Sequence, residues 1–464
     1  MEFAHKKITL MGLGLLGRGL GDARFFAERG AEVIVTDLKT EAELAPSVAA
    51  LAGFSNIAFH LGGHRMEDFE NRDLIVRAPN APLDSPFIAR ARERGIPVEM
   101  DAALFVKLCR ERFGDAAASG GGITIAGVTG TRGKSTVTQL IYEMARAAET
   151  DLAAADKNGG ESGGRVHLGG NVPDTATLPL IDAVRPGDTV ILELDSWQLQ
   201  GFAEDQLSPR IAAWTNFMPD HMNYYRGDMD RYFADKAAIA RFQKPGDWFV
   251  APRDIKERIE TRFGALAGNY AEPADLAGWE VALPGDHNRA DAAIAAAAAD
   301  RLGIPQNIIA AVLRTFTGLP NRLERLGEKN GIVFYNDSNA TTPQATIAAL
   351  STLSAAGRPI ILIAGGSDKE LDFDGLARAI PTQTKRLVLI RGSATEKLKL
   401  LLPAGIAPAD EASDMAAAFR AALAAAAPGD TILLSPGATS FGVFKNEYDR
   451  GDQFRACFEH LPEG

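Results

Sequence analysis

The stretch TIAGVTGTRGKSTVTQLIYEM, residues 124–144, decides how the whole sequence is interpreted. It joins an apolar run to a glycine-rich turn and then to an amphipathic run, which predicts a strand, a phosphate-binding loop and a helix. The usual G-x-x-x-x-G-K-[ST] spacing is not met, because Val128 stands where the first glycine belongs. Gly130 and Gly133 still let backbone N–H groups surround a phosphate, so the stretch predicts a nucleotide-binding α/β domain.

The residues after the loop glycines supply chemistry suited to a triphosphate. Lys134 places a positive charge near the β- and γ-phosphate oxygens. Ser135 or Thr136 can bind Mg²⁺ through a hydroxyl group. We therefore expect a nucleoside triphosphate and magnesium at this loop.

The composition is that of a soluble globular protein and limits the choice of partners. The 464 residues carry a net charge of −11, which argues against a nucleic-acid partner. The two cysteines, Cys109 and Cys457, lie far apart, which argues against a disulfide framework or a cysteine zinc site. The sequence has no 18-residue apolar run, and MEFAHKKITLMGLGLLG fits a first strand and turn better than a signal peptide. We expect a cytoplasmic, monomeric enzyme with no membrane insertion.

Strand and helix patterns alternate in three successive segments. KKITLMG, GDARFFAERG and AEVIVTD predict a βαβ unit, and the central segment adds DTVILELD and PRIAAWTNF as strands. The last segment contains GIVFYND, PIILIAGG, RLVLIRG and DTILLSPG, with helices between them, and GDAAASGGG is typical of a linker. The sequence predicts three α/β domains: a Rossmann-like domain over 1–115, a P-loop ATPase-like domain with a parallel sheet over 116–317, and a Rossmann-like domain over 318–464.

A second glycine-rich loop, GLGLLG, contains Gly12, Gly14 and Gly17 between an expected strand and helix. Asp37 ends the next strand, 20 residues after Gly17, as in a dinucleotide-binding fingerprint. The loop has three interpretations: it binds NAD or FAD, it binds another phosphate-bearing ligand, or it only closes a βα unit. The residues favour the second.

Further stretches occur in the order found in one family: LELDSWQL, TNFMPDHMNYY, DMDRYFADKAAIARF, PGDHNRADAAIA, GLPNRLE, YNDSNATTPQA, AGGSDKELDF and LSPGATSFGVFKNEYDRG. Together with the central loop, they resemble the Mur ligase family, the ATP-dependent amino-acid ligases of peptidoglycan precursor synthesis. The resemblance covers nearly the whole chain. The short first domain, NDSNAT and LSPGATSF resemble the glutamate-adding members.

The resemblance implies a two-step amide synthesis on UDP-N-acetylmuramoyl-L-alanine. ATP phosphorylates the substrate carboxylate, and the amino group of glutamate, expected to be D-glutamate, displaces phosphate through a tetrahedral intermediate. The resemblance assigns catalytic roles to Lys134, Glu193, His221 and Lys236. It also implies two Mg²⁺ sites, with Ser135, Glu193, His221 and Lys236 as ligands. Lys236 would be carbamylated by CO₂, which turns a cation into an oxygen donor.

The resemblance also assigns three substrate sites. The ATP site would contain Gly130, Thr131, Arg132, Gly133, Lys134, Ser135, Thr136, His287, Asn288, Arg322 and Asp337. The UDP-substrate site would contain Gly14, Leu15, Leu16, Asp37 and Asn171, and the amino-acid site Thr341, Lys369, Ser440 and Phe441. Because the first loop then serves the UDP group, the reason to expect NAD disappears.

Four positions depart from the family pattern. Arg132 stands where the phosphate loop usually has Asn, and Asp291 replaces an Asn near the adenine. Asn339 replaces a Lys before Ala-Thr, and Glu447 replaces an aromatic residue after Lys-Asn. The last two changes remove a cation and add an anion where the amino acid should bind, which weakens the case for a dicarboxylic acid. Glutamate remains favoured, with L-glutamate or another amino acid as alternatives.

Three other functions compete with this interpretation. Folylpolyglutamate synthesis lies within the family, but those enzymes lack a separate UDP-binding domain. An NAD-dependent oxidoreductase would use GLGLLG and leave Lys134, Glu193, His221 and Lys236 unexplained. A non-catalytic nucleotide-binding regulator would need no acceptor site in the third domain.

Overall fold

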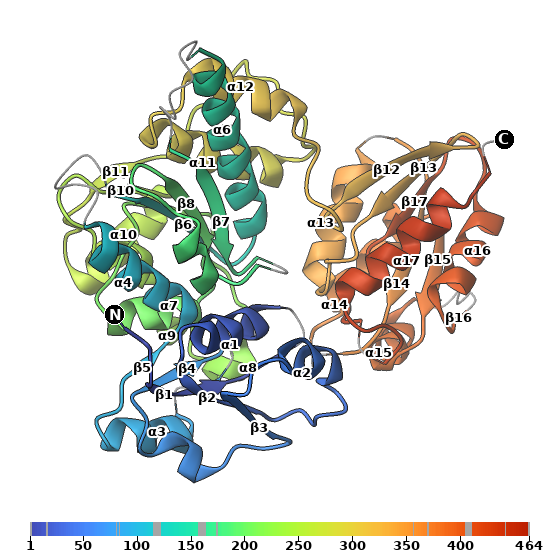
Figure 1. Cartoon of the computed structure of the whole chain (residues 1–464). Coiled ribbons are helices and arrows are strands. Elements are labelled where there is room, and N and C mark those ends of the chain that lie inside the picture. Colours follow the sequence, from blue (N-terminus) through green and yellow to red (C-terminus); the bar gives the residue numbers. More distant parts are fainter. Residues whose placement is uncertain are drawn as a thin grey trace. The chain divides into compact units, whose positions relative to one another are not determined.

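The computed structural model describes residues 2–14, 17–79, 81–82, 84–114, 122–155, 164–172, 175–355, 357–368, 371–403, 411–440 and 442–462, with 152–155 as backbone only. Within these ranges the chain forms three sheets in two compact units. The first unit comprises Met1–Val281 and Asp286–Thr315 and holds two sheets. The second unit comprises Ala282–Gly285 and Phe316–Gly464 and holds the third (Figure 1).

The first sheet has five parallel strands in the order β3-β2-β1-β4-β5 among the residues described. The strands are β1 (Lys7–Met11), β2 (Glu32–Asp37), β3 (Ile57–Leu61), β4 (Leu74–Arg77) and β5 (Val98–Glu99). The helices are α1 (Arg18–Glu28), α2 (Ala45–Leu51), the 3-10 helix η1 (Met66–Phe69) and α3 (Pro86–Glu93). The strand order reverses between β1 and β4, so the glycine loop after β1 lies at a topological switch point, where such sheets bind ligands.

The second sheet has six parallel strands in the order β11-β10-β9-β6-β8-β7 in the described part of the chain. They are β6 (Thr124–Thr129), β7 (Val166–Gly170), β8 (Thr189–Glu193), β9 (Ile211–Trp214), β10 (Trp248–Val250) and β11 (Asn269–Ala271). The helices are α4 (Asp101–Phe113), α6 (Lys134–Ala155), η2 (Leu178–Asp182), α7 (Gln198–Glu204), α8 (Met222–Tyr225), α9 (Met229–Arg241), α10 (Arg253–Phe263), α11 (Asp286–Arg301) and α12 (Gln306–Thr315). Helices α6 and α11 pack on this sheet, α12 packs against both of them, and α9 packs on the sheet strands β6 and β9.

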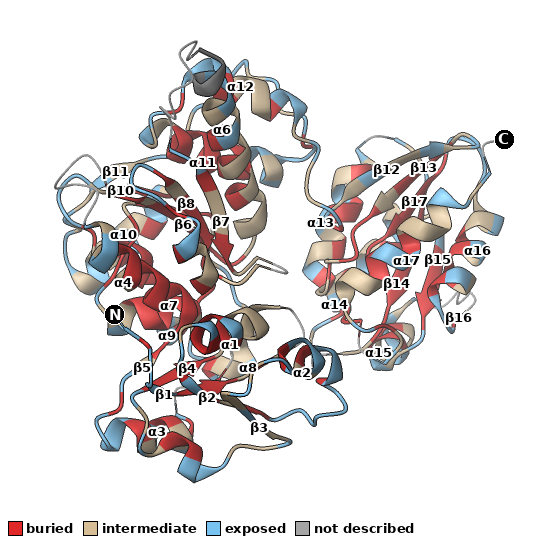
Figure 2. Cartoon of the chain, viewed as in Figure 1, coloured by how far each residue is buried: buried red, intermediate tan, exposed pale blue. Residues whose placement is uncertain are grey.

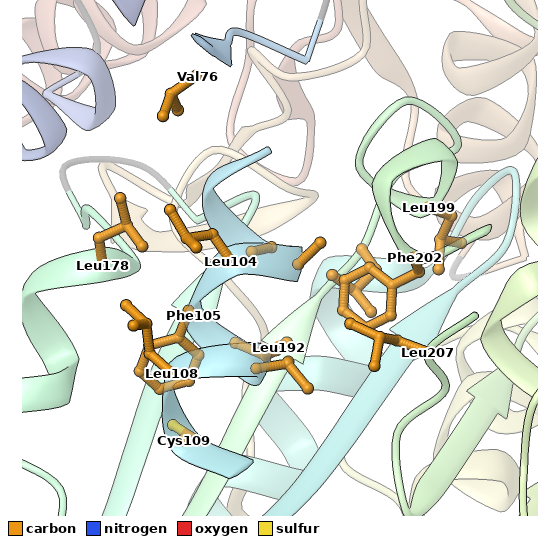
Figure 3. Packing of buried hydrophobic residues seen from close by; sticks show 14 of the residues in the cluster. Val76, Leu104, Phe105, Leu108, Cys109, Leu178, Leu192, Leu199, Phe202 and Leu207 are labelled. Carbon is orange, nitrogen blue, oxygen red and sulfur yellow. The ribbon is translucent and has the colours of Figure 1, made fainter. Parts of the chain in front are cut away.

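Helix α4 joins the first and second sheets through a continuous apolar core. Leu104 and Phe105 of α4 are buried in one cluster with Leu192 of β8 and Phe202 of α7 (Figure 3). Val76 of β4 belongs to the same cluster. Each such side chain contributes about 1.5–3 kcal/mol when it leaves water, which explains why the two sheets form one unit.

The third sheet has the order β12-β13-β17-β14-β15-β16 among the described residues. Its strands are β12 (Glu324–Lys329), β13 (Ile332–Asn336), β14 (Ile360–Gly365), β15 (Arg386–Ile390), β16 (Glu411–Ala412) and β17 (Thr431–Leu434). Helices α13 (Pro343–Ser354), α14 (Asp374–Gln383) and α15 (Ser393–Leu401) pack together in one apolar cluster. Helices α16 (Met415–Ala425) and α17 (Glu447–Glu459) share another, so both faces of the buried strands are covered (Figure 2).

The predicted fold class of three α/β domains with parallel sheets is confirmed, with one addition in the third. Strand β12 pairs antiparallel with β13 and was not expected. The signal was present, since Asn330 and Gly331 join the two strands with φ of 54° and 73°, as a tight hairpin turn requires. The domain boundaries at 115 and 317 stay a prediction. No helix in the described ranges is long and apolar enough to cross a membrane.

Candidate active site

The loop between β6 and α6 has the conformation that its glycines permit. Gly130 and Gly133 have φ of 145° and 78°, which disfavours other residues. A Cβ atom at Gly130 would overlap the Thr215 hydroxyl, and one at Gly133 would overlap the Asp291 carboxylate. The loop is also braced from the end of β9, because the Arg132 amide donates to Asn216 Oδ1 at 3.0 Å. Both glycines are therefore required by backbone conformation and by space.

Two lysines converge on this loop. Lys134 Nζ donates to the carbonyl oxygens of Gly130 at 3.1 Å and Thr131 at 3.0 Å. Lys236 Nζ donates to the same Gly130 oxygen at 2.7 Å, and lies 3.4 Å from Thr129 Oγ1. Lys134 supplies the positive charge that a polyphosphate requires, and Lys236 meets it at the same carbonyl oxygen.

Lys236 lies on α9 and is 1% exposed. Burial, followed by the charge of Lys134, holds the pKa of the Lys236 amine well below its ordinary value. A buried amine in this state is neutral over a wider pH range, and a neutral amine is nucleophilic. The environment therefore suits the reaction with CO₂ that the family resemblance implies.

His221 has a left-handed backbone, with φ of 53°, at the N-cap of α8. Its ring centroid lies 4.5 Å from that of Trp197. Burial lowers the pKa of His221, with the Asp220 carboxylate acting in the opposite direction and the Lys134 charge in the same direction as burial. A neutral imidazole is the form that binds a metal ion.

Glu193 ends β8 and is 4% exposed. Asn171 Nδ2 donates to Glu193 Oε1 at 3.2 Å, and the Asn171 amide donates to the Glu193 carbonyl at 2.7 Å. The structure thus brings together a predicted metal ligand and a predicted substrate-binding residue. A buried carboxylate is costly unless it is paired, and here the Asn171 side chain is its hydrogen-bond donor.

The donor set fits magnesium only in part. No three His, Cys, Asp or Glu residues among those described lie close enough together to hold a metal ion. The predicted ligands include only two residues of these types, Glu193 and His221, together with the Ser135 hydroxyl. Because Mg²⁺ prefers oxygen ligands, a second site needs the carbamate oxygens that modified Lys236 would supply.

The loop after β1 is organised by Asp37 at the end of β2. Asp37 Oδ2 accepts hydrogen bonds from the amides of Leu13 at 2.8 Å and Gly14 at 3.1 Å. Its other oxygen accepts from the Lys39 amide at 2.9 Å. The carboxylate therefore holds the loop directly, and its predicted contact with the UDP-substrate stays a prediction.

The remaining predicted residues are distributed over both units. His287 lies on α11 in the first unit, where burial lowers its pKa, and Asn288 follows it. Asp337 lies in the second unit and accepts from the Leu323 amide at 3.0 Å and Ser435 Oγ at 2.7 Å. Burial raises the pKa of Asp337 to about 7, against the hydrogen bonds from Ser435 and Leu323.

Two of the four residues predicted to bind the amino acid lie in the described ranges. Thr341 precedes α13, and Ser440 follows β17, where its hydroxyl is buried with no hydrogen-bond partner among the residues described. Leu15, Leu16, Lys369 and Phe441 lie outside the described residues.

The structure shows which groups contact three of the four residues that depart from the family pattern. Asp291 is buried against Gly133, so this change lies at the phosphate loop as well as near the expected adenine position. The amide of Asn339 donates to the Asn321 carbonyl at 2.9 Å, and its Oδ1 is buried without a hydrogen-bond partner in the described ranges. The carbonyl of Glu447 accepts from Ser338 Oγ at 2.6 Å.

Sequence reasoning missed Arg450, which is fully buried on α17. Its guanidinium donates to the Ser338 carbonyl at 2.7 Å, to Ser338 Oγ at 3.1 Å and to the Ala438 carbonyl at 3.1 Å. It thereby joins the loops that lead to Thr341 and Ser440. A charged residue in a helix sequence normally indicates a solvated face, so the sequence offered no local signal.

Comparisons with known proteins cover the same three regions. The profile of the Mur ligase MurD-like N-terminal domain matches residues 6–99, the Mur ligase middle domain 128–268, and the Mur ligase glutamate ligase domain 321–437. The chain is 38% identical to the UDP-N-acetylmuramoylalanine–D-glutamate ligase of Roseiflexus sp. (strain RS-1), over 99% of each chain. It is 33% identical to the protein of that name from Symbiobacterium thermophilum, over 98% of each. The crystal structure of UDP-N-acetylmuramate–alanine ligase from Thermotoga maritima aligns with a TM-score of 0.59 at 18% identity, covering 98% of this chain and 99% of that one.

Proposed function

The chain belongs to the Mur ligase family, and from this premise we propose that it is the ATP-dependent ligase that joins D-glutamate to UDP-N-acetylmuramoyl-L-alanine in peptidoglycan precursor synthesis. Relatives that match almost end to end carry the name of this activity. The observation that carries the proposal is the meeting of Lys134 and Lys236 at the Gly130 carbonyl.

The reaction has two steps. A carboxylate oxygen of the alanyl group attacks the γ-phosphorus of ATP, which forms an acyl phosphate and releases ADP. The amino group of D-glutamate then attacks the acyl carbon, and the tetrahedral intermediate loses a proton and phosphate to leave the amide. The protein contributes by positioning the reactants and by balancing crowded negative charge.

Lys134 and the loop glycines position the phosphates of ATP. We assign residues 130–136 to the ATP phosphates, since the loop curves closely and Lys134 Nζ already faces its carbonyl edge. His287, Asn288, Arg322 and Asp337 are assigned to the base and ribose of ATP.

Mg²⁺ supplies a counter-charge for the transferred phosphoryl group. We assign Ser135 and Glu193 to one ion, and His221 with carbamylated Lys236 to a second. Burial of Lys236 supports the carbamate, because the neutral amine can attack CO₂ and release one proton. Asn171 would keep Glu193 oriented through its side-chain hydrogen bond. Asn171 would also contact the substrate near the reacting carboxylate.

We propose a main task for each predicted domain, with Asn171, Arg322 and Asp337 assigned as above. Residues 1–115 bind the UDP-substrate through Gly14, Leu15, Leu16 and Asp37. Residues 116–317 bind ATP. Residues 318–464 bind the amino acid through Thr341, Lys369, Ser440 and Phe441. We further propose a cytoplasmic monomer that acts on small molecules and has no nucleic-acid partner.

One observation favours a second candidate, a Mur ligase that adds a different amino acid or L-glutamate. Asn339 and Glu447 alter the charge expected near the amino-acid site. Lys369 still offers a cation for a side-chain carboxylate, so D-glutamate remains the first choice.

The test is phosphate release from ATP with UDP-N-acetylmuramoyl-L-alanine and Mg²⁺, with D-glutamate, L-glutamate and other amino acids offered separately. Turnover with D-glutamate alone supports the proposal. Turnover only with another amino acid supports the second candidate, and no turnover with any of them contradicts both.

A further inference from the structure

A buried polar chain runs from the first sheet to the helix that carries Lys236. It starts at Arg77, the last residue of β4, which is 1% exposed. Arg77 Nη1 donates to the Ala81 carbonyl at 3.1 Å, and Nη2 donates to Gln200 Oε1 at 3.1 Å. Gln200 is buried on α7, so a guanidinium from the first sheet contacts a helix that belongs to the second.

The side-chain amide of Gln200 also contacts α9. Its Nε2 donates to Asp235 Oδ2 at 2.6 Å, and the same oxygen accepts from the Tyr225 hydroxyl at 3.0 Å. The two neighbours fix the amide orientation, because a guanidinium only donates and an ionised carboxylate only accepts. Arg77, Gln200, Asp235 and Tyr225 are called the relay below.

At the end away from Arg77, the relay residues Asp235 and Tyr225 adjoin predicted catalytic residues. Asp235 directly precedes Lys236 on α9. Tyr225 is the last residue of α8, and His221 is the N-cap of that helix. Tyr225 is 1% exposed, so the tie to Asp235 lies in the interior.

Helix α8 needs such a tie. It has four residues, and the residues that flank it, His221 and Arg226, both have φ of 53°. A left-handed backbone costs roughly 1–2 kcal/mol at a residue other than glycine, so surrounding contacts must hold it. One contact on Arg226, an ion pair with Asp84 at 2.5 Å, is exposed and contributes little. The buried hydroxyl of Tyr225 is therefore a stronger restraint than this ion pair, and the Tyr224 hydroxyl, 3.3 Å from the Gln200 side chain, adds a longer contact.

The other end of the relay adjoins the loop that would bind the UDP-substrate. Ala78 follows Arg77 and packs so closely on the loop that a Cβ atom at Gly12 would overlap the Ala78 Cβ. A shift of the loop would therefore reach Arg77 through one residue.

We propose that the relay residues are positioning residues, which hold His221 and Lys236 in register with each other and tie both to β4 of the first sheet. The role given to His221 and Lys236 rests on the proposed function, but the tie itself does not. Apolar residues of similar size would pack this interior without the desolvation cost of Arg77 and Asp235. The hydrogen bonds provide directions that apolar packing would lack.

The first test compares two tyrosines in the full chain. Tyr225→Phe removes the relay hydroxyl and keeps the ring. Tyr270→Phe is the matched control, because its hydroxyl donates one bond of 3.0 Å to the Ala251 carbonyl, away from the relay. The measurement is amide hydrogen exchange of the peptide spanning residues 220–228, without substrates. Tyr225→Phe should speed exchange there by about fivefold or more, and Tyr270→Phe should not.

The second test separates positioning from fold stability by kinetics. Tyr225→Phe should lower kcat by about tenfold while KM for ATP changes by less than about twofold. Asp235→Asn keeps an oxygen that can accept both bonds and should retain at least about a third of wild-type kcat, whereas Asp235→Leu should lose about tenfold or more.

The outcomes distinguish the relay from the proposed function. Unchanged exchange in Tyr225→Phe, or equal loss of kcat in Asp235→Asn and Asp235→Leu, overturns the positioning role. Faster exchange in Tyr225→Phe together with a wild-type protein that releases no phosphate keeps the tie and rejects the proposed function.

Discussion

The two glycine-rich loops of the first unit share one architecture and differ in the charges that surround them. Each follows a strand at a switch point of a parallel sheet and leads into a helix. The loop after β1 is held by a carboxylate, since Asp37 accepts from the amides of Leu13 and Gly14. The loop after β6 receives two lysines at its Gly130 carbonyl.

This difference shows that the glycine pattern predicts a conformation, whereas the neighbouring side chains decide which ligand is favoured. An acidic residue that occupies loop amides leaves fewer donors for a phosphate and suits a ligand held by other groups. The charge of Lys134 beside the second loop suits the most highly charged ligand available, a triphosphate.

The largest expected effect comes from removing charge at the second loop. Lys134→Met keeps most of the length of the side chain and should lower kcat/KM for ATP by about 10³-fold or more, because the transferred phosphoryl group loses its fixed counter-charge. Phosphate release is the measurement, and unchanged thermal unfolding is the control for folding. Activity within tenfold of wild type would mean that Lys134 does not contact the transferred phosphate.

A pair of glycine substitutions tests the two loops against each other. In Gly133→Ala the new methyl group meets the Asp291 carboxylate, so we expect kcat/KM for ATP to fall by about 10²-fold. In Gly14→Ala nothing lies within 4 Å of the new Cβ, and φ of 63° costs about 1–2 kcal/mol.

Gly14→Ala should therefore leave KM for ATP unchanged and raise KM for the UDP-substrate severalfold, because the methyl group points into open space at the expected binding loop. Steady-state kinetics with each substrate varied in turn gives both constants. An equal loss of ATP affinity in the two variants would contradict the division of labour between the loops.

The comparison also explains which features could be predicted from the sequence. Local patterns predicted the strand, loop and helix around Lys134, because apolar periodicity and glycine spacing are properties of neighbouring residues. The meeting of Lys236 with Gly130 depends on residues 106 positions apart, and the family resemblance indicated only that Lys236 belongs to the same site as Lys134. Arg450 and Gln200 were missed because a buried polar side chain carries no local mark of its burial. The hairpin at Asn330 had a local mark that was passed over.

Lys236, which contacts the second loop from α9, should make the free energy of unfolding depend on pH. Burial keeps the pKa of the folded-state amine well below the ordinary value that applies in the unfolded chain. Between these two values the unfolded state binds more protons, so the free energy of unfolding rises with pH through that window. Urea unfolding from pH 7 to 10 in bicarbonate-free buffer should show this rise relative to Lys236→Met. Parallel pH profiles for the two proteins would mean that Lys236 is not buried as a neutral amine.

The smallest expected effect concerns the second unit, where Asn339 replaces the lysine expected from the family. Asn339 Oδ1 is buried without a hydrogen-bond partner among the residues described, so its side chain gains little from its surroundings. Asn339→Lys should lower KM for D-glutamate by about two- to tenfold, the usual size of one added charge-assisted contact, and leave KM for ATP unchanged. Asn330→Lys is the matched control, since it adds the same charge in the β12–β13 turn. If both variants change KM for D-glutamate equally, the effect is general attraction of an anion. If only Asn339→Lys acts, position 339 faces the incoming amino acid, and side chains rather than the shared fold set the preference there too.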